Sequence, residues 1–366
     1  MSVPKGVDVK KYDRKMAPDD APSSGLEWRV PSLPPFRLAG FPWFAADGVY
    51  RRMPLRPKEK LPEAVDNLAD CTAGGQVLFQ STSKRLAVRV KLKGPAGMVH
   101  MPATGQCGFD LYVGPPCRKV YFSTTKYDLK QSEYEVLMFE RIDDALANFT
   151  LNFPLYQGVK EVLVGLDSGA EIAPPPPFAL PAPIVFYGTS ITQGGCASRP
   201  GMAYTNIISR RLNVEVINLG FSGSGKGEPE VARNIAEIPS PALLVLDYDA
   251  NCHGHDNLKN TLEEFIRILR GTHPGTPILV ITRPPRAAEL FQPGAASERR
   301  QRLEIQREAV ERFKRAGDDN LFFLDGSSLL GEDWHECTVD GSHPTDLGFL
   351  RMAQNIEPVI RRILSL

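Results

Sequence analysis

The 366-residue sequence predicts an α/β protein in two parts, an antiparallel β-sandwich followed by a doubly wound parallel sheet. The first part contains short apolar or alternating runs that are separated by turn residues. The second part contains short, nearly continuous apolar runs that alternate with helical patterns, which is typical of strands buried on both faces. Between the two parts, residues 173–183 include six prolines in eleven positions, which excludes a helix or a central strand.

The first part is predicted to consist of an arm and a sandwich. Residues 1–40 are polar and rich in proline, so they are expected to form an irregular amino-terminal arm. Residues 41–172 are expected to form the sandwich, because several segments have strand length and are separated by glycine-containing turns. These segments are residues 77–82, 86–92, 109–113, 119–123 and 161–166.

The second part is predicted to begin after a stiff, extended linker at residues 173–183. Residues 184–366 then contain five candidate strands, at 184–187, 215–218, 242–246, 278–281 and 321–324. The segments between them have helical spacing, as in residues 297–314, where apolar side chains share one stripe. In a doubly wound sheet ligands bind beyond the carboxyl ends of the strands, so these ends are where chemistry is expected.

Composition excludes several classes of function. The 43 basic residues balance the 43 acidic ones, which argues against a dedicated nucleic-acid binder and against electrostatic docking to a membrane. The sequence contains no run of about 18 apolar residues, so no transmembrane helix is predicted. Residues 1–20 contain no apolar stretch typical of a secretory signal, so a cytoplasmic protein is expected unless a signal was removed. The sequence does not predict the oligomeric state.

The first candidate for chemistry is the segment Gly188–Gly195, which directly follows the first strand of the second part. Its glycines permit tight turns, and Ser190 is predicted to lie at the edge of the sheet as a nucleophile. An ordinary strand-to-helix loop with a capping serine is the alternative. The segment lacks the G-K-[ST] ending of a phosphate loop and the G-x-S-x-G pattern of an α/β-hydrolase elbow.

A second candidate lies near the end of the sequence, in residues 340–344. Asp340 and His343 are three residues apart, so they share one side of a turn. This spacing lets the carboxylate hold one imidazole nitrogen while the other acts as a general base. The alternative is a solvated turn in which the aspartate caps a helix.

Two further segments follow the second and third strands of the second part. Residues 218–225 form a glycine-rich loop whose backbone N–H groups, including that of Gly223, are suited to stabilising an oxyanion. Residues 247–252 contain Asn251, whose amide is a second candidate donor. The alternatives are a flexible connector and a turn asparagine.

These four segments, each after a strand of one sheet, resemble the conserved blocks of the SGNH/GDSL hydrolase superfamily. The blocks match Ser190, Gly223, Asn251 and His343, and Asp340 matches the third member of the triad. The usual G-D-S-L reads G-T-S-I here, and the third block lacks the common G-x-N-D form. The segment G-F-D-L-Y at 108–112 also resembles the G-x-D-L-Y mark of a β-rich domain that precedes a bacterial subgroup of such esterases.

The resemblance implies a serine esterase that acts on small acyl esters, and O-deacetylation of carbohydrates is a frequent activity in such two-domain enzymes. It implies that Ser190 attacks, that His343 transfers the proton and that Asp340 orients His343. The N–H groups of Ser190 and Gly223 and the Asn251 amide would form the oxyanion hole, and neither a metal nor an organic cofactor is implied. An acyltransferase that uses the same acyl-enzyme and a non-catalytic carbohydrate-binding protein are the alternatives.

Overall fold

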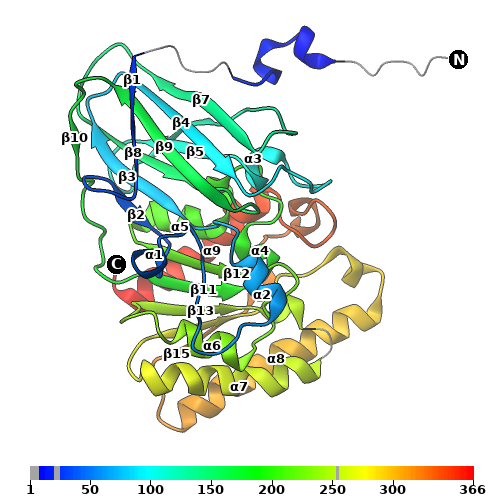
Figure 1. The fold of residues 1–366 in the computed structure, drawn as a ribbon. Helices are drawn as coiled ribbons and strands as arrows, with labels where there is room; N and C mark the ends of the chain where they lie inside the picture. The colour runs from blue at the N-terminus through cyan, green and yellow to red at the C-terminus, as the bar shows by residue number, and fades with distance from the viewer. Residues whose placement is uncertain (1–7, 20–24, 253–254) are drawn as a thin grey trace, which may run out of the picture.

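A computed structural model describes residues 8–19, 25–252 and 255–366 of the chain. It shows a β-sandwich stacked on an α/β domain, with the strands of the sandwich above the helices and the parallel sheet in Figure 1. The predicted fold class is therefore confirmed.

The sandwich consists of two antiparallel sheets. One has the strand order β1-β9-β4-β7, and the other has the order β10-β3-β8-β5-β6 with β2 paired to β3. Their bounds are β1 Leu26–Arg29, β2 Arg37–Ala39, β3 Gln76–Ser81, β4 Arg85–Leu92, β5 Asp110–Val113, β6 Val120–Thr124, β7 Glu133–Glu140, β8 Ala147–Asn152, β9 Val159–Asp167 and β10 Ile172–Ala173. The short helices α1 Phe44–Asp47, α2 Glu63–Leu68 and α3 Ala103–Gln106 lie in the connections.

Alternation along the strands builds the core of the sandwich. In β4, Leu86, Val88 and Val90 are buried in the apolar cluster between the sheets. Arg89 and Lys91 lie on the opposite face, where Arg89 pairs with a glutamate of β7. This two-residue period is the pattern from which the strand at 86–92 was predicted.

The prediction that residues 1–40 form an irregular arm is wrong for its last third, because β1 and β2 both lie there. β1 pairs with β9 so that Trp28 lies opposite Gly165. The absence of a side chain at Gly165 leaves room for the indole, since a Cβ there would lie 2.9 Å from the ring. The guanidinium of Arg89 stacks on Trp28 at 4.1 Å. Composition alone did not indicate these packing partners.

The second part contains a five-stranded parallel sheet with the order β12-β11-β13-β14-β15. Its strands are β11 Ile184–Gly188, β12 Val216–Gly220, β13 Leu243–Asp247, β14 Ile278–Ile281 and β15 Leu321–Leu324. Its helices are α4 Ser190–Gln193, α5 Tyr204–Leu212, α6 Pro229–Ile235, α7 His255–Thr272, α8 Pro293–Arg315 and α9 Asp346–Leu364. The chain order reverses at β11, which pairs with both β12 and β13, so ligands are expected beside this strand.

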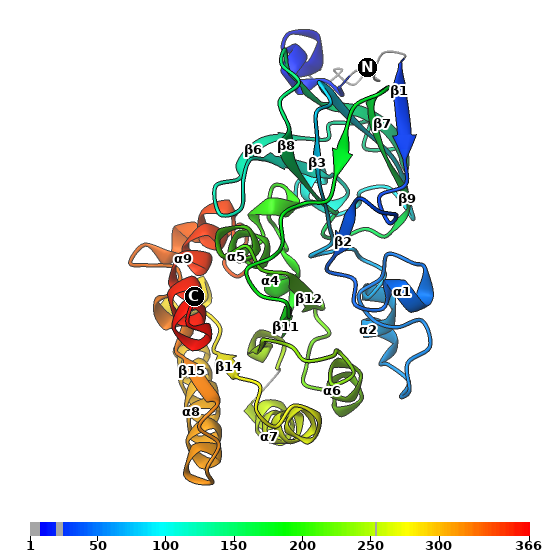
Figure 2. The same ribbon diagram turned by 90° about the vertical axis from the view of Figure 1, so that its left-hand side faces the viewer.

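Helices cover both faces of this sheet, as Figure 2 shows. Val185 and Tyr187 of β11 belong to the apolar cluster that includes residues of α6, α7 and α8. Ile184 and Phe186 belong to the cluster that includes residues of α5 and α9. Burial on both faces explains why the strands read as continuous apolar runs in the sequence.

The predicted sandwich boundary at residues 41–172 is also partly wrong. Met53, Leu61 and Val65 are buried in the core of the parallel sheet and not in the core of the sandwich. α2 lies beside α6 and β12 in Figure 2. The fully buried guanidinium of Arg52 donates to the carbonyl oxygens of Asn218 and Gly220 at the edge strand β12. The core around the parallel sheet therefore includes a segment that lies between β2 and β3 of the sandwich.

The proline-rich segment is fixed to both parts of the protein. Residues 174–183 contain no helix or strand. Arg37 Nη1 donates to the Pro176 carbonyl at 2.8 Å, and the Ala179 N–H donates to the Asn213 carbonyl at 2.8 Å. Within the described residues, no helix is long and apolar enough to cross a membrane.

Candidate active site

Ser190 is the first residue of α4, immediately after β11 and its Thr189 cap. The Thr189 hydroxyl accepts the Ile191 N–H at 3.2 Å, and the Thr192 hydroxyl accepts the Thr189 N–H at 3.4 Å. Thr189 thus caps the helix, at the position where the G-D-S-L motif has aspartate. A side chain at Gly188 would lie 2.0 Å from the Thr192 hydroxyl, so this tight turn requires glycine.

The three residues of the predicted triad form a chain of hydrogen bonds. His343 Nε2 lies 2.9 Å from Ser190 Oγ, and His343 Nδ1 lies 2.7 Å from Asp340 Oδ2. Ser190 is separated from His343 by 153 positions in the sequence. The turn before α9 therefore places the imidazole over the start of α4, with one nitrogen facing the serine and the other facing the carboxylate.

Asp340 is held as an anion by the turn that contains it. Burial alone would raise its pKa, but hydrogen bonds from the backbone and ring of His343 outweigh burial and lower the pKa below its ordinary value. The N–H groups of Ser342 and His343 both donate to Oδ1, at 3.0 and 2.8 Å. The carboxylate is therefore kept ionised and is oriented toward His343 Nδ1.

Asn251, in the turn after β13, is hydrogen-bonded to the loop that follows β12 and carries Gly223. The Asn251 side-chain amide donates to the Phe221 carbonyl at 3.2 Å, and the Ser224 N–H donates to the same oxygen at 3.0 Å. Gly223 has a φ of 67°, which is a left-handed conformation that favours glycine. Among the described residues, the N–H groups of Ser190 and Gly223 have no protein acceptor. Both donors are thus available to a bound group.

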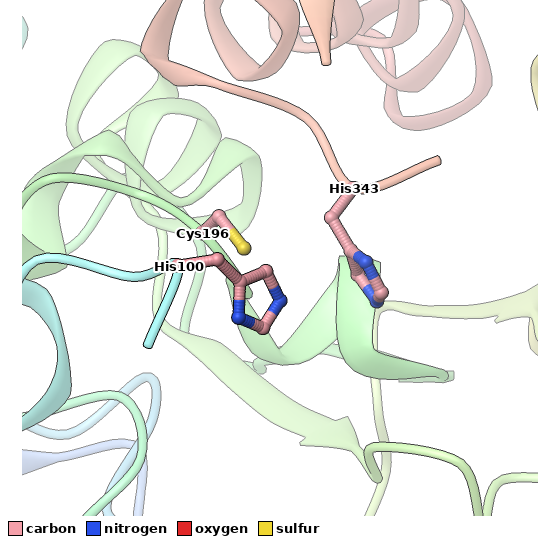
Figure 3. A group of neighbouring side chains, drawn as sticks. All are labelled: His100, Cys196 and His343. Atoms are coloured by element: carbon pink, nitrogen blue, oxygen red, sulfur yellow. The ribbon is translucent and has the colours of Figure 1, made fainter. Parts of the chain in front are cut away.

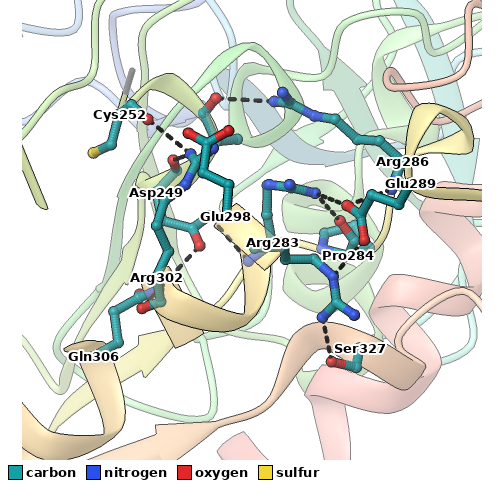
Figure 4. A network of polar contacts seen from close by, with 12 residues as sticks. Asp249, Cys252, Arg283, Pro284, Arg286, Glu289, Glu298, Arg302, Gln306 and Ser327 are labelled. Carbon is teal, nitrogen blue, oxygen red and sulfur yellow. Dashed lines mark hydrogen bonds and ion pairs between the residues drawn. The ribbon is translucent and has the colours of Figure 1, made fainter. Parts of the chain in front are cut away.

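A buried polar network fixes the turn that carries Asn251 (Figure 4). Arg302 of α8 donates to the carbonyl oxygens of Asp249 and Cys252, both at 2.8 Å. Gln306 donates to the Asp249 carboxylate at 2.9 Å, and the Arg283 N–H donates to it at 3.0 Å. The turn that carries Asn251 is therefore held by two side chains of α8 and by a backbone N–H of the loop after β14.

The G-F-D-L-Y segment joins the two parts of the protein. Asp110 is fully buried, and its carboxylate accepts hydrogen bonds from Arg199 at 3.0 Å, the Gly201 N–H at 2.7 Å and Asn152 at 2.7 Å. Arg199 also donates to Tyr112 at 2.6 Å and stacks on a neighbouring aromatic ring of β6 at 3.7 Å. Since Arg199 and Gly201 follow α4, this motif attaches the sandwich to the loop beyond Ser190.

Sequence analysis missed three residues around the triad. The Tyr156 hydroxyl donates to the Ser190 carbonyl at 3.2 Å. The His100 ring lies 5.9 Å from the His343 ring, between centroids, and Cys196 lies near both imidazoles. Tyr156 and His100 belong to loops of the sandwich, and no motif marks either of them. Their role in the site follows only from how the two parts of the chain pack.

Family models match almost the whole described chain. The model of the GDSL-like lipase/acylhydrolase family matches residues 181–361, and the model of the G-x-D-L-Y amino-terminal domain of SGNH-type esterases matches residues 26–172. A crystal structure from Bacteroides ovatus, assigned as a GDSL-like lipase, has 30% sequence identity and a TM-score of 0.85, and the alignment covers 93% of this chain and 98% of that one. The chain belongs to the GDSL-like lipase/acylhydrolase family. The predicted resemblance is therefore confirmed.

Other structures of the same fold are more distant from this GDSL-like chain. The salicylyl-acyltransferase SsfX3 from a tetracycline biosynthetic pathway has 19% identity and a TM-score of 0.71, with 94% of this chain and 98% of that chain covered. An acetyl xylan esterase from the rumen bacterium Butyrivibrio proteoclasticus has 12% identity and a TM-score of 0.61, with 93% and 100% covered. No curated protein matches the sequence.

Proposed function

We propose that the protein is a serine esterase that hydrolyses small acyl esters through an acyl-enzyme. The observation that carries the proposal is the pair of hydrogen bonds that joins Ser190 to His343 and His343 to Asp340. This arrangement activates a serine hydroxyl, which is a weak nucleophile without an adjacent base. An intact relay also argues against a protein that only binds carbohydrate.

In this mechanism Ser190 Oγ attacks the ester carbonyl while His343 Nε2 accepts its proton. The imidazolium then donates that proton to the leaving alcohol, and Asp340 stabilises the charged ring. Water repeats the sequence to release the acid. The N–H groups of Ser190 and Gly223 and the amide of Asn251 are proposed to stabilise the oxyanion, because the first two are unpaired and the third is hydrogen-bonded to the loop that carries Gly223.

The proposed substrate is an acetylated carbohydrate. Only 8% of the Ser190 surface is exposed, so the ester must reach a nearly buried hydroxyl, and acetyl is a small acyl group with which to test this access. The acetyl xylan esterase of Butyrivibrio proteoclasticus and a family two carbohydrate esterase from Cellvibrio japonicus share the two-domain fold over 93% of this chain. Their names motivate the choice of sugar esters for the assay.

An acyltransferase is the second candidate. The salicylyl-acyltransferase has a higher TM-score to this chain than the carbohydrate esterases, 0.71 against 0.61 or less. Such an enzyme would form the same acyl-enzyme on Ser190 but would deliver the acyl group to an alcohol. Product analysis with and without candidate acceptor alcohols separates the two activities.

The central test is Ser190→Ala on p-nitrophenyl acetate and on acetylated oligosaccharides. We expect loss of turnover with an unchanged unfolding transition, and we expect a serine-directed phosphonate to label the wild type at Ser190 alone. Ser342→Ala is the matched control, because only its backbone N–H contacts Asp340. An active Ser190→Ala variant, or labelling at another residue, contradicts the proposal.

A further inference from the structure

Three potential metal ligands from separate parts of the chain converge beside Ser190 (Figure 3). One ligand atom each from His100, Cys196 and His343 lie within 4.8 Å of one another. His100 belongs to the loop between β4 and α3, Cys196 follows α4, and His343 belongs to the turn before α9. The cluster therefore exists only when the sandwich is packed on the parallel sheet.

The backbone at Cys196 is strained. Its φ is 107°, a backbone conformation that residues other than glycine rarely adopt. Hydrogen bonds on both sides hold it there, because the Gly195 N–H donates to the Ser190 carbonyl at 2.8 Å and the Ala197 N–H donates to the Gly194 carbonyl at 3.0 Å. Figure 3 shows the Cys196 sulfur beside the His100 ring. The hydrogen bonds of this turn thus keep a thiol next to two imidazoles in spite of the strain.

Two imidazoles and one thiolate form a ligand set that suits zinc and similar thiophilic cations. Ligand atoms that share a tetrahedral zinc ion lie roughly 3.3–3.8 Å apart. The present spacing of up to 4.8 Å must shorten for a shared ion, and His100, with a side chain that is 37% exposed, is the most exposed of the three ligands. Ser190 Oγ or water completes the tetrahedron.

We propose that His100, Cys196 and His343 form an inhibitory binding site for a thiophilic divalent cation of the zinc class. The Cys196 thiol loses its proton to solvent as the sulfur–metal bond forms, so charge and atoms balance. His343 has two nitrogens, and one is bound to Ser190 while the other is bound to Asp340. A cation that takes either nitrogen breaks one of these hydrogen bonds, so it stops proton transfer from Ser190.

The carboxylate of Asp340 lies beside the cluster, with its Oδ2 3.8 Å from His100 Nε2. Its negative charge favours a bound cation at this position.

The inhibitory effect rests on the proposed esterase function, but cation binding does not. The first measurement is therefore titration of the full-length, chelator-treated protein with Co²⁺, which reports a thiolate ligand through its charge-transfer absorption. We expect one bound equivalent in the wild type and in Ser190→Ala, which is inactive under the proposed mechanism. Displacement of Co²⁺ by Zn²⁺ then gives the zinc affinity.

Variants of the two ligands outside the triad test the site. His100→Gln and Cys196→Ser should each weaken Co²⁺ and Zn²⁺ binding about tenfold or more. For each variant, esterase activity with Zn²⁺ is divided by its activity without Zn²⁺, and this ratio should fall only at correspondingly higher zinc concentrations. EDTA should reverse the inhibition of the wild type. The exposed residues His335 and Cys117 provide the controls His335→Gln and Cys117→Ser, which should leave the affinity unchanged.

Three results would overturn the proposal. The first is a wild-type protein without the thiolate absorption band. The second is His100→Gln with unchanged affinity, which remains informative even if Cys196→Ser does not fold. The third is activation of turnover by Zn²⁺. If Co²⁺ binds as expected but the wild type has no esterase activity, the metal site stands and the proposed function fails.

Discussion

Asp110→Asn should destabilise the protein strongly without removing its chemistry. The substitution keeps the shape of the side chain but removes the charge that Arg199 pairs with at 3.0 Å. Asparagine offers one oxygen, so whichever way its amide is turned, an N–H₂ group faces either Asn152 or the donors Arg199 and Gly201. Each of these partners donates to the native carboxylate, so one contact becomes repulsive.

The magnitude follows from the burial of the pair. Removing one partner of a buried ion pair costs about 3–5 kcal/mol of unfolding free energy. The Asp110 side chain is fully buried, but Arg199 keeps 17% of its surface exposed, so we expect about 3 kcal/mol, at the lower end. The assay is urea unfolding followed by circular dichroism, with kcat for p-nitrophenyl acetate measured below the transition.

Asp340→Asn is the matched control, because it makes the same chemical change at a carboxylate that is 35% exposed. It should cost less than about 1 kcal/mol of stability and lower kcat by about 10⁴-fold, since the imidazole loses its orienting partner. Asp110→Asn should show the reverse pattern, with kcat within about threefold of the wild type. A loss of stability below about 1 kcal/mol for Asp110→Asn would refute the interpretation of Asp110 as the anchor between the two parts.

Three other predictions concern the site and its supports. Asn251→Ala should lower kcat by about 10²–10³ with little change in KM, whereas Asn234→Ala, a buried asparagine elsewhere, should keep a normal kcat. Arg302→Met should lower kcat in the wild type but have no further effect in Asn251→Ala, because it acts by fixing the Asn251 turn; additive losses would contradict this. Burial raises the pKa of Asp247 from 3.8 to about 7, so between these values the folded state binds more protons than the unfolded state and stability should fall as pH rises. Urea unfolding at several pH values should show that slope in the wild type and a flatter profile in Asp247→Asn.

The strands and the positions of the four candidate segments after them could be predicted because their signals are local. The apolar runs of β11 to β15 have the composition of buried parallel strands, and Ser190, Gly223 and Asn251 each directly follow one of them. The spacing of Asp340 and His343 likewise fits within one turn. The hydrogen bonds among the triad residues have the arrangement that these positions imply.

The missed features depend on contacts between distant segments. The role of Arg52 depends on a strand that lies 166 positions further along the chain, and nothing in its neighbours indicates that partner. His100 and Tyr156 likewise reach the site only because the sandwich packs on the loop after α4. The composition of residues 1–40 predicted an arm because β1 and β2 are too short to give a clear pattern. Their stability comes from pairing with other strands and from Trp28. The β-propensity of their residues predicts such strands poorly, because it depends on the packing partners.

The position of Arg52 also protects the protein from self-association. β12 is an edge strand of the parallel sheet, and an open edge with free carbonyl groups is a template onto which another chain can add a strand. Arg52 occupies two of these carbonyl groups, and the segment around α2 covers the adjoining apolar surface. A chain cut at the proline-rich segment would keep every residue of the triad yet lose this cover. Such a fragment should aggregate through β12, so the half that carries the candidate triad depends on Arg52 and the segment around α2 for its solubility.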